Sequence, residues 1–508
     1  MSAEVIYQTT TAFNRFYSWC VRPEVRKHFI ILIIINFANY LSVIRANYLY
    51  RDDIIKTVLN NEGWEQEGRL LSYLFSKILF FGTNADASPF TQITAILIIS
   101  ASSLVVGYGF CRHKPILISY LAPICIFPYV LENISYKFYA LWMSIAILVS
   151  IIPVIFLFID HTLTKTIVTF ICTLMCLNIY QVATGIFIIL FCQKILQDIR
   201  TTEPISIIIK KNVSSIIGFF LAFTAYYFEV KFISPVTSQW GSSHSETIFF
   251  TSNWTQTLAN NIENYFQYIY EDWVETPFWF IIIVNTYIIT AISLRNIFKA
   301  QNIIQSVQKS FLYILATMTI IIAPHFPQLI LTRPVLQPRT FLSFGVLTSI
   351  MLVDATLLLY KYNKYKIILL AINTYLICNF LIIGNIYGNL LSAQDTWENN
   401  ILPILTNDLQ KVKEDKKCHD IFISDDIGYS PAFRNISNNY RVLRKLIEPR
   451  LGNDYFPEYY LRYYGLHFRK HIKAYYGPYQ TIISSPRYDI GVLPDNTCFI
   501  SFKKIDPL

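Results

Sequence analysis

Residues 28–69, HFIILIIINFANYLSVIRANYLYRDDIIKTVLNNEGWEQEGR, join a strongly apolar run to a densely charged loop. The apolar part, residues 28–44, is long enough to cross a bilayer as a helix. Two adjacent carboxylates, Asp52 and Asp53, follow it, and the loop carries further charges up to Arg69. A charged loop beside a span is usually only a solvated connection. Its function therefore depends on what the remaining chain places on the same membrane face.

The composition of the whole chain is that of a membrane protein. Of its 508 residues, 54% are hydrophobic and 15% are charged, with a mean hydropathy of +0.40, whereas soluble domains carry about 25% charged residues. Apolar runs long enough to span a bilayer recur, and the polar–apolar alternation of a membrane β-barrel is absent from the sequence. The lysines and arginines behind the net charge of +9 are spread over short connections, so no nucleic-acid partner is expected. The sequence predicts an α-helical polytopic membrane protein.

The distribution of positive charge predicts the orientation of the chain. About eleven spans put the basic connections on one side, which is the cytoplasmic side by the positive-inside rule. The expected spans lie near 28–44, 91–110, 116–131, 137–159, 163–179, 181–196, 212–230, 276–294, 309–323, 340–360 and 366–385. The chain then divides into a cytoplasmic segment 1–27, a membrane domain 28–385 with outer loops 45–90, 231–275 and 324–339, and a periplasmic tail 386–508. The stretch 163–196 is either two short spans or a re-entrant hairpin.

The tail is the only part that is expected to fold outside the membrane. From Asn400 it loses the apolar runs, and it is large enough for a small domain of mixed α and β structure. Its only cysteines are Cys418 and Cys498. In an oxidising compartment these two are candidates for a disulfide, and the alternative is two core thiols. The sequence has no glycine-rich phosphate-binding loop, which argues against a site for ATP or a sugar nucleotide.

Several polar side chains that a plain scaffold would not need share the expected outer face. They are Asp52, Asp53, Arg69, Asp86, Glu132, Asn133, Tyr180, Gln181, His325, Arg333 and Arg339. A carboxylate can accept the proton of an attacking hydroxyl, and a guanidinium can bind two oxygens of a phosphate. Arg333 and Arg339 lie in an outer loop against the positive-inside bias, so an anion such as a lipid phosphate is their expected partner. Each residue alone is most often an interfacial contact, but together they suit transfer of a sugar from a lipid phosphate to a hydroxyl.

Five stretches resemble, in order, parts of the serotype-converting O-antigen glucosyltransferases. They are YRDDIIKTVLNNEGWEQEGRLLSYLFSKILFFG with DASPFTQI, then ENISYKFYALWMS, NIYQ, QPRTFLSFG and NIYGNLLSAQDTWE. The similarity extends from about residue 30 to residue 410, and the tail corresponds only in size and place. Tyr139 departs from the pattern, because an acidic residue is expected there in relatives, so no role is assigned to it.

The resemblance implies a GT-C-like glycosyltransferase of the bacterial inner membrane. Such an enzyme takes glucose from undecaprenyl-phosphate glucose and adds it to lipid-linked O-antigen units at the periplasmic face, which converts the serotype. The matching positions are Asp52 and Asp53 for catalysis and Arg69, Glu132, Asn133, Tyr180, Gln181 and Arg339 for substrate binding. Arg333 is added as a further substrate-binding candidate because it lies in the outer loop. Membrane lipids, a small flippase and a polyprenyl-phosphate glucosyltransferase are the further expected partners. No cofactor is assigned, and the DD pair, unlike a D-x-D, is compatible with a divalent metal without indicating one.

Two other functions fit a polytopic chain. An O-antigen polymerase is expected to carry its catalytic arginines in two large central outer loops. A lipid or polysaccharide transporter (flippase) would place charges within spans and often show two related halves. This chain instead has a DD loop after its first span, and neither of the two transporter features is clear in the sequence.

The adjacent carboxylates of Asp52 and Asp53 are not expected to face the same acceptor. If they start a helix, their side chains point about 100° apart. We therefore expect one to act as the base and the other to hold the loop or pair with Arg69. Asparagine at the catalytic position should remove roughly 2–4 orders of magnitude of rate, and Asp53 is the position expected to be more sensitive.

Overall fold

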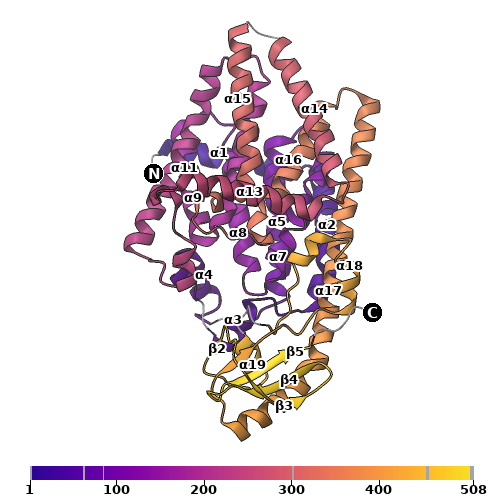
Figure 1. Cartoon of the computed structure of the whole chain (residues 1–508). Helices are drawn as coiled ribbons and strands as arrows, with labels where there is room; N and C mark the ends of the chain where they lie inside the picture. Colours follow the sequence, from indigo (N-terminus) through magenta and orange to yellow (C-terminus); the bar gives the residue numbers. More distant parts are fainter. Residues whose placement is uncertain (1–2, 61–62, 84, 300–302, 453–456, 504–508) are drawn as a thin grey trace.

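The structure, a computed structural model, describes residues 3–60, 63–83, 85–299, 303–452 and 457–503. It is a bundle of long helices with a small β-sheet domain at one end (Figure 1). Within those ranges nine helices are long and apolar enough to cross a membrane. Two of the eleven expected spans, 116–131 and 137–159, appear instead as shorter apolar helices over Pro115–Ile126 and Ala140–Ile155. The expected class, a polytopic helical membrane protein with a C-terminal α+β domain, is confirmed.

The long apolar helices form the body of the bundle. They are α2 (Pro23–Ala46), α5 (Phe90–Phe110), α9 (Thr162–Ile179), α10 (Thr184–Ile199), α11 (Ile205–Phe232), α14 (Phe278–Lys299), α15 (Ile303–Ile322), α16 (Ser343–Leu358) and α17 (Asn363–Lys416). The stretch 163–196 forms two helices, α9 and α10, which are separated by the turn η4 (Gln181–Ala183). The break occurs at Tyr180, whose backbone is extended (φ −155°, ψ 96°).

Prolines divide the third and fourth expected spans into short pieces. These are η2 (Pro115–Leu121), α6 (Pro123–Ile126), α7 (Val130–Ser135), α8 (Ala140–Ile151) and η3 (Ile152–Ile155). Phe127 is extended (φ −58°, ψ 134°) because a following proline, here Pro128, disfavours helical backbone at the residue before it. The short helix α7 is buried along its whole length, and it carries Glu132 and Asn133 into the interior.

The last apolar helix, α17, continues past the membrane domain into the tail. It has 54 residues, and at a rise of 1.5 Å per residue it is about 80 Å long. The boundary expected at residue 386 therefore falls inside a helix. Gly384 lets α17 approach α2 closely, because a Cβ at this position would lie 2.1 Å from Asn39 Oδ1. One continuous helix thus joins the tail to the bundle.

The tail folds as a five-stranded sheet packed on the end of α17. The sheet contains β1 (Ile421–Ile423), β2 (His471–Ile472), β3 (Gln480–Ser484), β4 (Tyr488–Val492) and β5 (Cys498–Phe502), in the order β2-β1-β5-β4-β3. Strand β1 is parallel to β2 and β5, and the other pairs are antiparallel. Leu405, Leu409 and Val412 of α17 share a core with the strands. A disulfide between Cys418 and Cys498 joins the end of α17 to β5.

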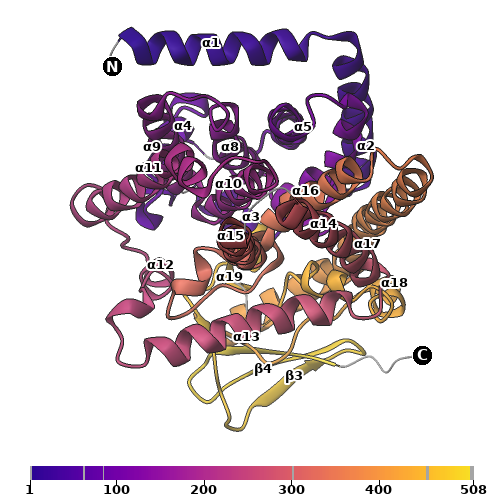
Figure 2. The ribbon, with the colours of Figure 1, turned by 90° about the horizontal axis from the view of Figure 1, so that it is seen from above.

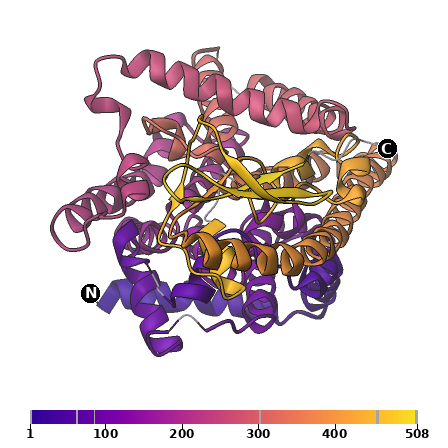
Figure 3. The ribbon, with the colours of Figure 1, turned by 60° about the horizontal axis from the view of Figure 1, so that its bottom comes forward.

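Other helices lie across the bundle or cap its ends. Figure 2 shows α1 (Ala3–Cys20) and α13 (Trp254–Trp273) lying crosswise on opposite sides of the bundle. The outer loop 45–90 contains α3 (Asp53–Leu59), η1 (Glu65–Glu67) and α4 (Leu70–Leu79), and the tail contains α18 (Pro431–Ile436), η9 (Arg441–Lys445) and α19 (Pro457–Tyr463). The remaining short helices are α12 (Gln239–Ser243), η5 (Ile248–Phe250), η6 (Ala323–His325), η7 (Gln328–Ile330) and η8 (Pro338–Phe341). Seen from below, the tail lies in front of the bundle end (Figure 3).

Candidate active site

Asp53 is the first residue of α3 and is completely buried. Its carboxylate accepts hydrogen bonds from the backbone N–H groups of Lys137 (3.0 Å), Tyr50 (3.2 Å) and Phe138 (3.4 Å). Burial raises the pKa of Asp53 to about 8, against the opposing effect of these three donors. The side chain therefore ties the outer loop after α2 to the segment that precedes α8.

Asp52, the neighbouring carboxylate, lies in a different environment. It is partly exposed, and its carboxylate accepts no hydrogen bond from any residue that the structure describes. Burial raises the pKa of Asp52 above its ordinary value, and the positive charge of Arg339 is the main effect that opposes this rise. Arg51 and Lys56 also lower it, whereas the negative charge of Glu67 raises it. A carboxylate with a raised pKa and no internal partner is suited to accept a proton from a ligand.

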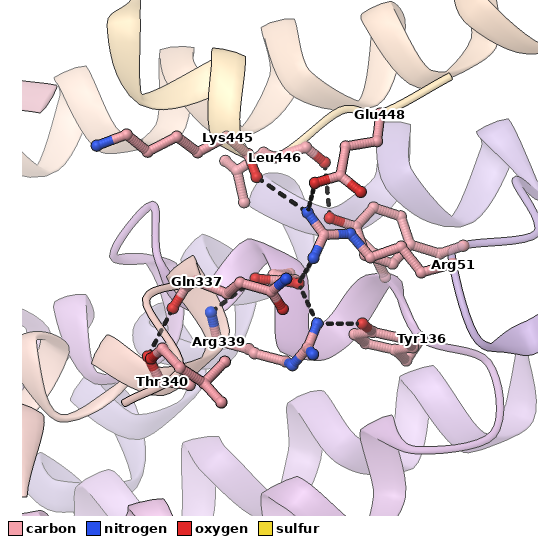
Figure 4. A network of polar contacts seen from close by, with 12 residues as sticks. Arg51, Tyr136, Gln337, Arg339, Thr340, Lys445, Leu446 and Glu448 are labelled. Carbon is pink, nitrogen blue, oxygen red and sulfur yellow. Dashed lines mark hydrogen bonds and ion pairs between the residues drawn. The ribbon is translucent and has the colours of Figure 1, made fainter. Parts of the chain in front are cut away.

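Two arginines share one buried carboxylate beside this loop (Figure 4). Oε1 of Glu132 lies 3.1 Å from Arg51 Nη1 and 2.8 Å from Arg339 Nη1, while Oε2 accepts the backbone N–H of Arg339 at 2.7 Å. Nη1 of Arg339 also donates to the Tyr136 hydroxyl at 2.6 Å. Glu132 is fully buried, and removing one partner of a buried ion pair costs about 3–5 kcal/mol. Glu132 thus fixes the position of both guanidinium groups.

Arg339 retains hydrogen-bonding capacity beyond these contacts. Its Nε and Nη2 donate to no residue in the described part of the chain, and 14% of its side chain is exposed. Its position follows from η8, the proline-initiated turn that leads into α16. The free side of a guanidinium offers the forked donor geometry that phosphate oxygens accept.

A segment of the tail covers the arginine pair (Figure 4). Arg51 Nη2 donates to Glu448 Oε1 at 2.6 Å and to the Lys445 carbonyl at 3.2 Å. The Tyr50 hydroxyl donates to the carbonyl of Leu446 at 2.7 Å. Lys445 also reaches α13, where its Nζ lies 2.9 Å from Asp272 Oδ1. We call residues 441–450 the tail strap, because they bridge the outer loop and α13.

Aromatic rings and further cations line the region next to Asp52. The rings of Trp64 and Tyr139 are 4.5 Å apart, and Lys56 Nζ lies 5.2 Å and 5.6 Å from their centroids. Arg69 stands over the Tyr180 ring at 5.6 Å and pairs with Glu67 at 3.0 Å. The position of Tyr139, where an acidic residue was expected in relatives, is thus filled by a ring that packs beside a lysine.

The other residues singled out from the sequence fall into two groups. Asn133 and Tyr180 are buried and contact the Arg339 carbonyl, at 3.5 Å from Asn133 Nδ2 and 3.1 Å from the Tyr180 hydroxyl. Gln181 donates to the Tyr226 hydroxyl at 2.9 Å. Arg333, in contrast, is exposed and forms no ion pair within the described ranges. Two further candidates also lie outside this group: Asp86 pairs with Lys137 at 3.3 Å, and the buried His325 stacks on Phe341 at 4.5 Å.

Several residues of the site were not among those candidates, including Arg51, Lys56, Tyr136 and Glu448. Arg51 and Lys56 flank the two aspartates in sequence, and that proximity was a usable signal. No sequence signal pointed to Glu448, because it is one of several acidic residues in a polar tail. In the part of the chain described here, no cluster of three or more His, Cys, Asp or Glu side chains has the arrangement of a metal site.

Comparison with known proteins identifies the family. The family model described as "Glucosyl transferase GtrII" matches residues 41–350. An uncharacterized 55.3 kDa protein in the gtrB 5' region of Salmonella phage P22 is 28% identical over 224 residues, which are 42% of this chain and 44% of that protein. The alignment thus spans less than half of either chain, and no solved structure matches. Because the family model covers more than half of the sequence, from the end of α2 to α16, the chain belongs to the GtrII glucosyl transferase family.

Proposed function

We propose that this protein transfers glucose from undecaprenyl-phosphate glucose to lipid-linked O-antigen at the periplasmic face of a bacterial inner membrane. The observation that carries the proposal is the partly exposed carboxylate of Asp52, which accepts no hydrogen bond from a described residue and lies near the fixed guanidinium of Arg339. Membership of the glucosyl transferase family supports the reaction class. The apolar helices around the site suit a donor and an acceptor that both carry a polyprenyl chain.

In the proposed reaction, Asp52 accepts the proton of an acceptor hydroxyl. The hydroxyl oxygen forms a bond to C1 of glucose while the bond between C1 and the phosphate oxygen breaks. The electron pair of that bond leaves with the polyprenyl phosphate, whose added negative charge the Nε and Nη2 groups of Arg339 stabilise. Arg69 and Lys56 are further cations near the same region. The step needs only a weak base, because the phosphate is already a good leaving group.

Asp53 and Glu132 have positioning roles in this proposal. Asp53 is fully buried and bonded to three backbone N–H groups, so we propose Asp52 as the base, in place of the expectation that Asp53 is the more sensitive position. Glu132 holds Arg51 and Arg339 and has no exposed surface for a substrate. Tyr180 and Asn133 donate hydrogen bonds to the backbone carbonyl of Arg339.

The function is tested by expressing the chain in a strain with a defined, unmodified O-antigen. The strain is supplied with a polyprenyl-phosphate glucosyltransferase and a small flippase, the partners that would make the donor and move it outward. Analysis of the isolated polysaccharide should find one added glucose per repeat, and none when the donor-forming enzyme is omitted. Longer chains without added glucose would instead support a polymerase. Unmodified O-antigen in the complete strain would contradict the proposal.

A further inference from the structure

A basic pocket lies at the end of the bundle opposite to the candidate active site. It has a volume of about 510 Å³ and lies between α1 and the end of α5; its lining residues are Thr11, Asn14, Arg15, Ser18, Trp19, Arg22, Tyr108, Arg112 and His113. Helix α2 starts at Pro23, beside the pocket, and ends at Ala46, just before Asp52. Its 24 residues span about 36 Å at 1.5 Å per residue, which is enough to cross a bilayer core of about 30 Å. The pocket therefore belongs to the other membrane face.

The walls of the pocket are held by contacts within the protein. Thr11, Arg15, Ser18 and Arg22 recur at helical spacing, so α1 and its C-terminal turn present them on one face. Trp19 donates its indole N–H to the Arg112 carbonyl at 3.0 Å. Its ring also packs edge-on against Tyr108 at 5.6 Å, and Phe16 does the same at 5.3 Å. The crosswise helix seen in Figure 2 is thus docked on α5 at this place.

The charge of the pocket is uncompensated. Among the described residues that line it, three are arginines, Arg15, Arg22 and Arg112, and none is acidic. None of these arginines forms an ion pair with a described residue. Like charges gathered at one site repel one another, and an anion whose oxygens accept from guanidinium groups would relieve that repulsion. A phosphate group has this chemistry.

A second face of α1 indicates that the anion belongs to a lipid. Ile6, Phe13 and Tyr17 share one stripe of the helix and are 51%, 42% and 68% exposed. An amphipathic helix with exposed apolar and aromatic side chains beside arginines lies in the plane of a membrane interface, at the depth of the lipid headgroups. We propose that this pocket binds the phosphodiester headgroup of an anionic phospholipid, and so fixes α1 against the cytoplasmic leaflet.

The experiment compares two triple variants of the full-length protein that lose the same charge. The pocket variant is Arg15→Gln, Arg22→Gln and Arg112→Gln. The control is Arg295→Gln, Lys299→Gln and Lys361→Gln, which lie near the same end of the bundle and outside the pocket. Binding of phosphatidylglycerol and of phosphatidylcholine to each detergent-purified protein is measured by native mass spectrometry. Retained glucose transfer shows that both variants are folded.

We expect the wild type and the control to bind phosphatidylglycerol in preference to phosphatidylcholine. Since each cation near a lipid surface contributes about 1 kcal/mol to binding, the pocket variant should bind phosphatidylglycerol on the order of 100-fold more weakly. Equal binding by the pocket variant, or an equal loss in the control, would overturn the proposal. So would soluble glycerol phosphate binding as tightly as the lipid, because the site would then serve a free anion.

Discussion

At the scale of single residues, Asp52 and Asp53 carry identical side chains but differ in burial and in hydrogen bonding. Asp53 has no exposed surface and accepts three backbone N–H groups, whereas Asp52 is partly exposed and accepts no hydrogen bond from a described residue. The first arrangement fixes the fold of the loop, and the second leaves a carboxylate available to a ligand. The two positions should therefore respond differently to substitution and to pH.

Replacing Asp53 should affect stability before it affects chemistry. In Asp53→Ala, the N–H groups of Tyr50, Lys137 and Phe138 lose their acceptor inside the protein, and a few such losses together cost about 2–4 kcal/mol of folding free energy. Asp53→Asn keeps a carbonyl acceptor and should lose much less. The midpoint of thermal unfolding in detergent measures both. An alanine variant as stable as the wild type would show that these hydrogen bonds do not hold the loop.

The rate of glucose transfer should fall at low pH. Asp52 must be ionised to accept a proton, and burial raises its pKa above the ordinary value of 3.8. Activity is thus full above that raised pKa and is lost as the pH falls through it. A pH–rate profile of the purified enzyme should have its acid limb at a higher pH than a free aspartate gives. A profile that stays flat down to pH 3.8 would exclude Asp52 as the base.

The sequence could locate this pair but not distinguish its members. The alternation of charged connections predicted one membrane face for Asp52, Asp53, Arg69, Glu132, Tyr180 and Arg339, and the five motifs singled out the same residues. The structure brings these residues together. Their individual roles depend on tertiary contacts. Two of the three donors to Asp53 come from Lys137 and Phe138, more than 80 positions away, and burial at such a contact leaves no periodic signal in the sequence.

At the scale of elements, the tail strap is the part of the site that no motif indicated. It is outside the matched family region, which ends at residue 350, yet Glu448 and the Lys445 carbonyl hold Arg51. The sequence also did not predict where the helices in this region end. Residues 116–131 are one apolar run and were expected to form one span, but Pro128 separates α6 from the buried short helix α7, which carries Glu132. Composition predicts that a segment is apolar, but local backbone chemistry decides where its helix stops.

Glu448→Gln should change the pH dependence of the reaction. This substitution removes a negative charge 2.6 Å from Arg51, so the positive charge of Arg51 acts more fully on Asp52. The pKa of Asp52 should then fall, and the acid limb of the pH–rate profile should move to lower pH. Loss of one charge-assisted hydrogen bond should also slow transfer about tenfold. Asp425→Asn, which changes an exposed tail carboxylate, serves as the control. If the Glu448 variant and the control have the same pH–rate profile, the tail strap does not contribute to the site.

At the scale of the whole molecule, α17 and the disulfide join the tail to the membrane domain. The alternation of charged connections predicts that the tail is periplasmic. The helical membrane class on which this prediction is based is confirmed, and the orientation stays a prediction. The Cys418–Cys498 bond is consistent with an oxidising compartment. The continuity of α17 past residue 386 was not predictable, because Gly384, Gly388 and Pro403 are residues at which a helix commonly ends, yet all three lie inside it.

The orientation is testable with thiol reagents on intact cells. In spheroplasts, a membrane-impermeant maleimide should label Cys418 and Cys498 only after reduction, because both are expected on the outer side and are bonded to each other. A cysteine placed at exposed Lys361 should remain unlabelled until the membrane is permeabilised, since that connection is expected in the cytoplasm. Labelling of Lys361→Cys in intact cells would reverse the topology and move the candidate site to the cytoplasmic face.

The most direct test of the central claim compares Asp52→Asn with Asp53→Asn in one assay. Both variants are purified, matched for folded protein, and supplied with undecaprenyl-phosphate glucose and a lipid-linked acceptor, and the initial rate of glucose transfer is measured. If Asp52 is the base, Asp52→Asn should lose roughly 2–4 orders of magnitude in rate, while Asp53→Asn should stay within about tenfold of the wild type because it keeps an acceptor for the loop. The reverse order, or wild-type rates in both, would contradict the assignment.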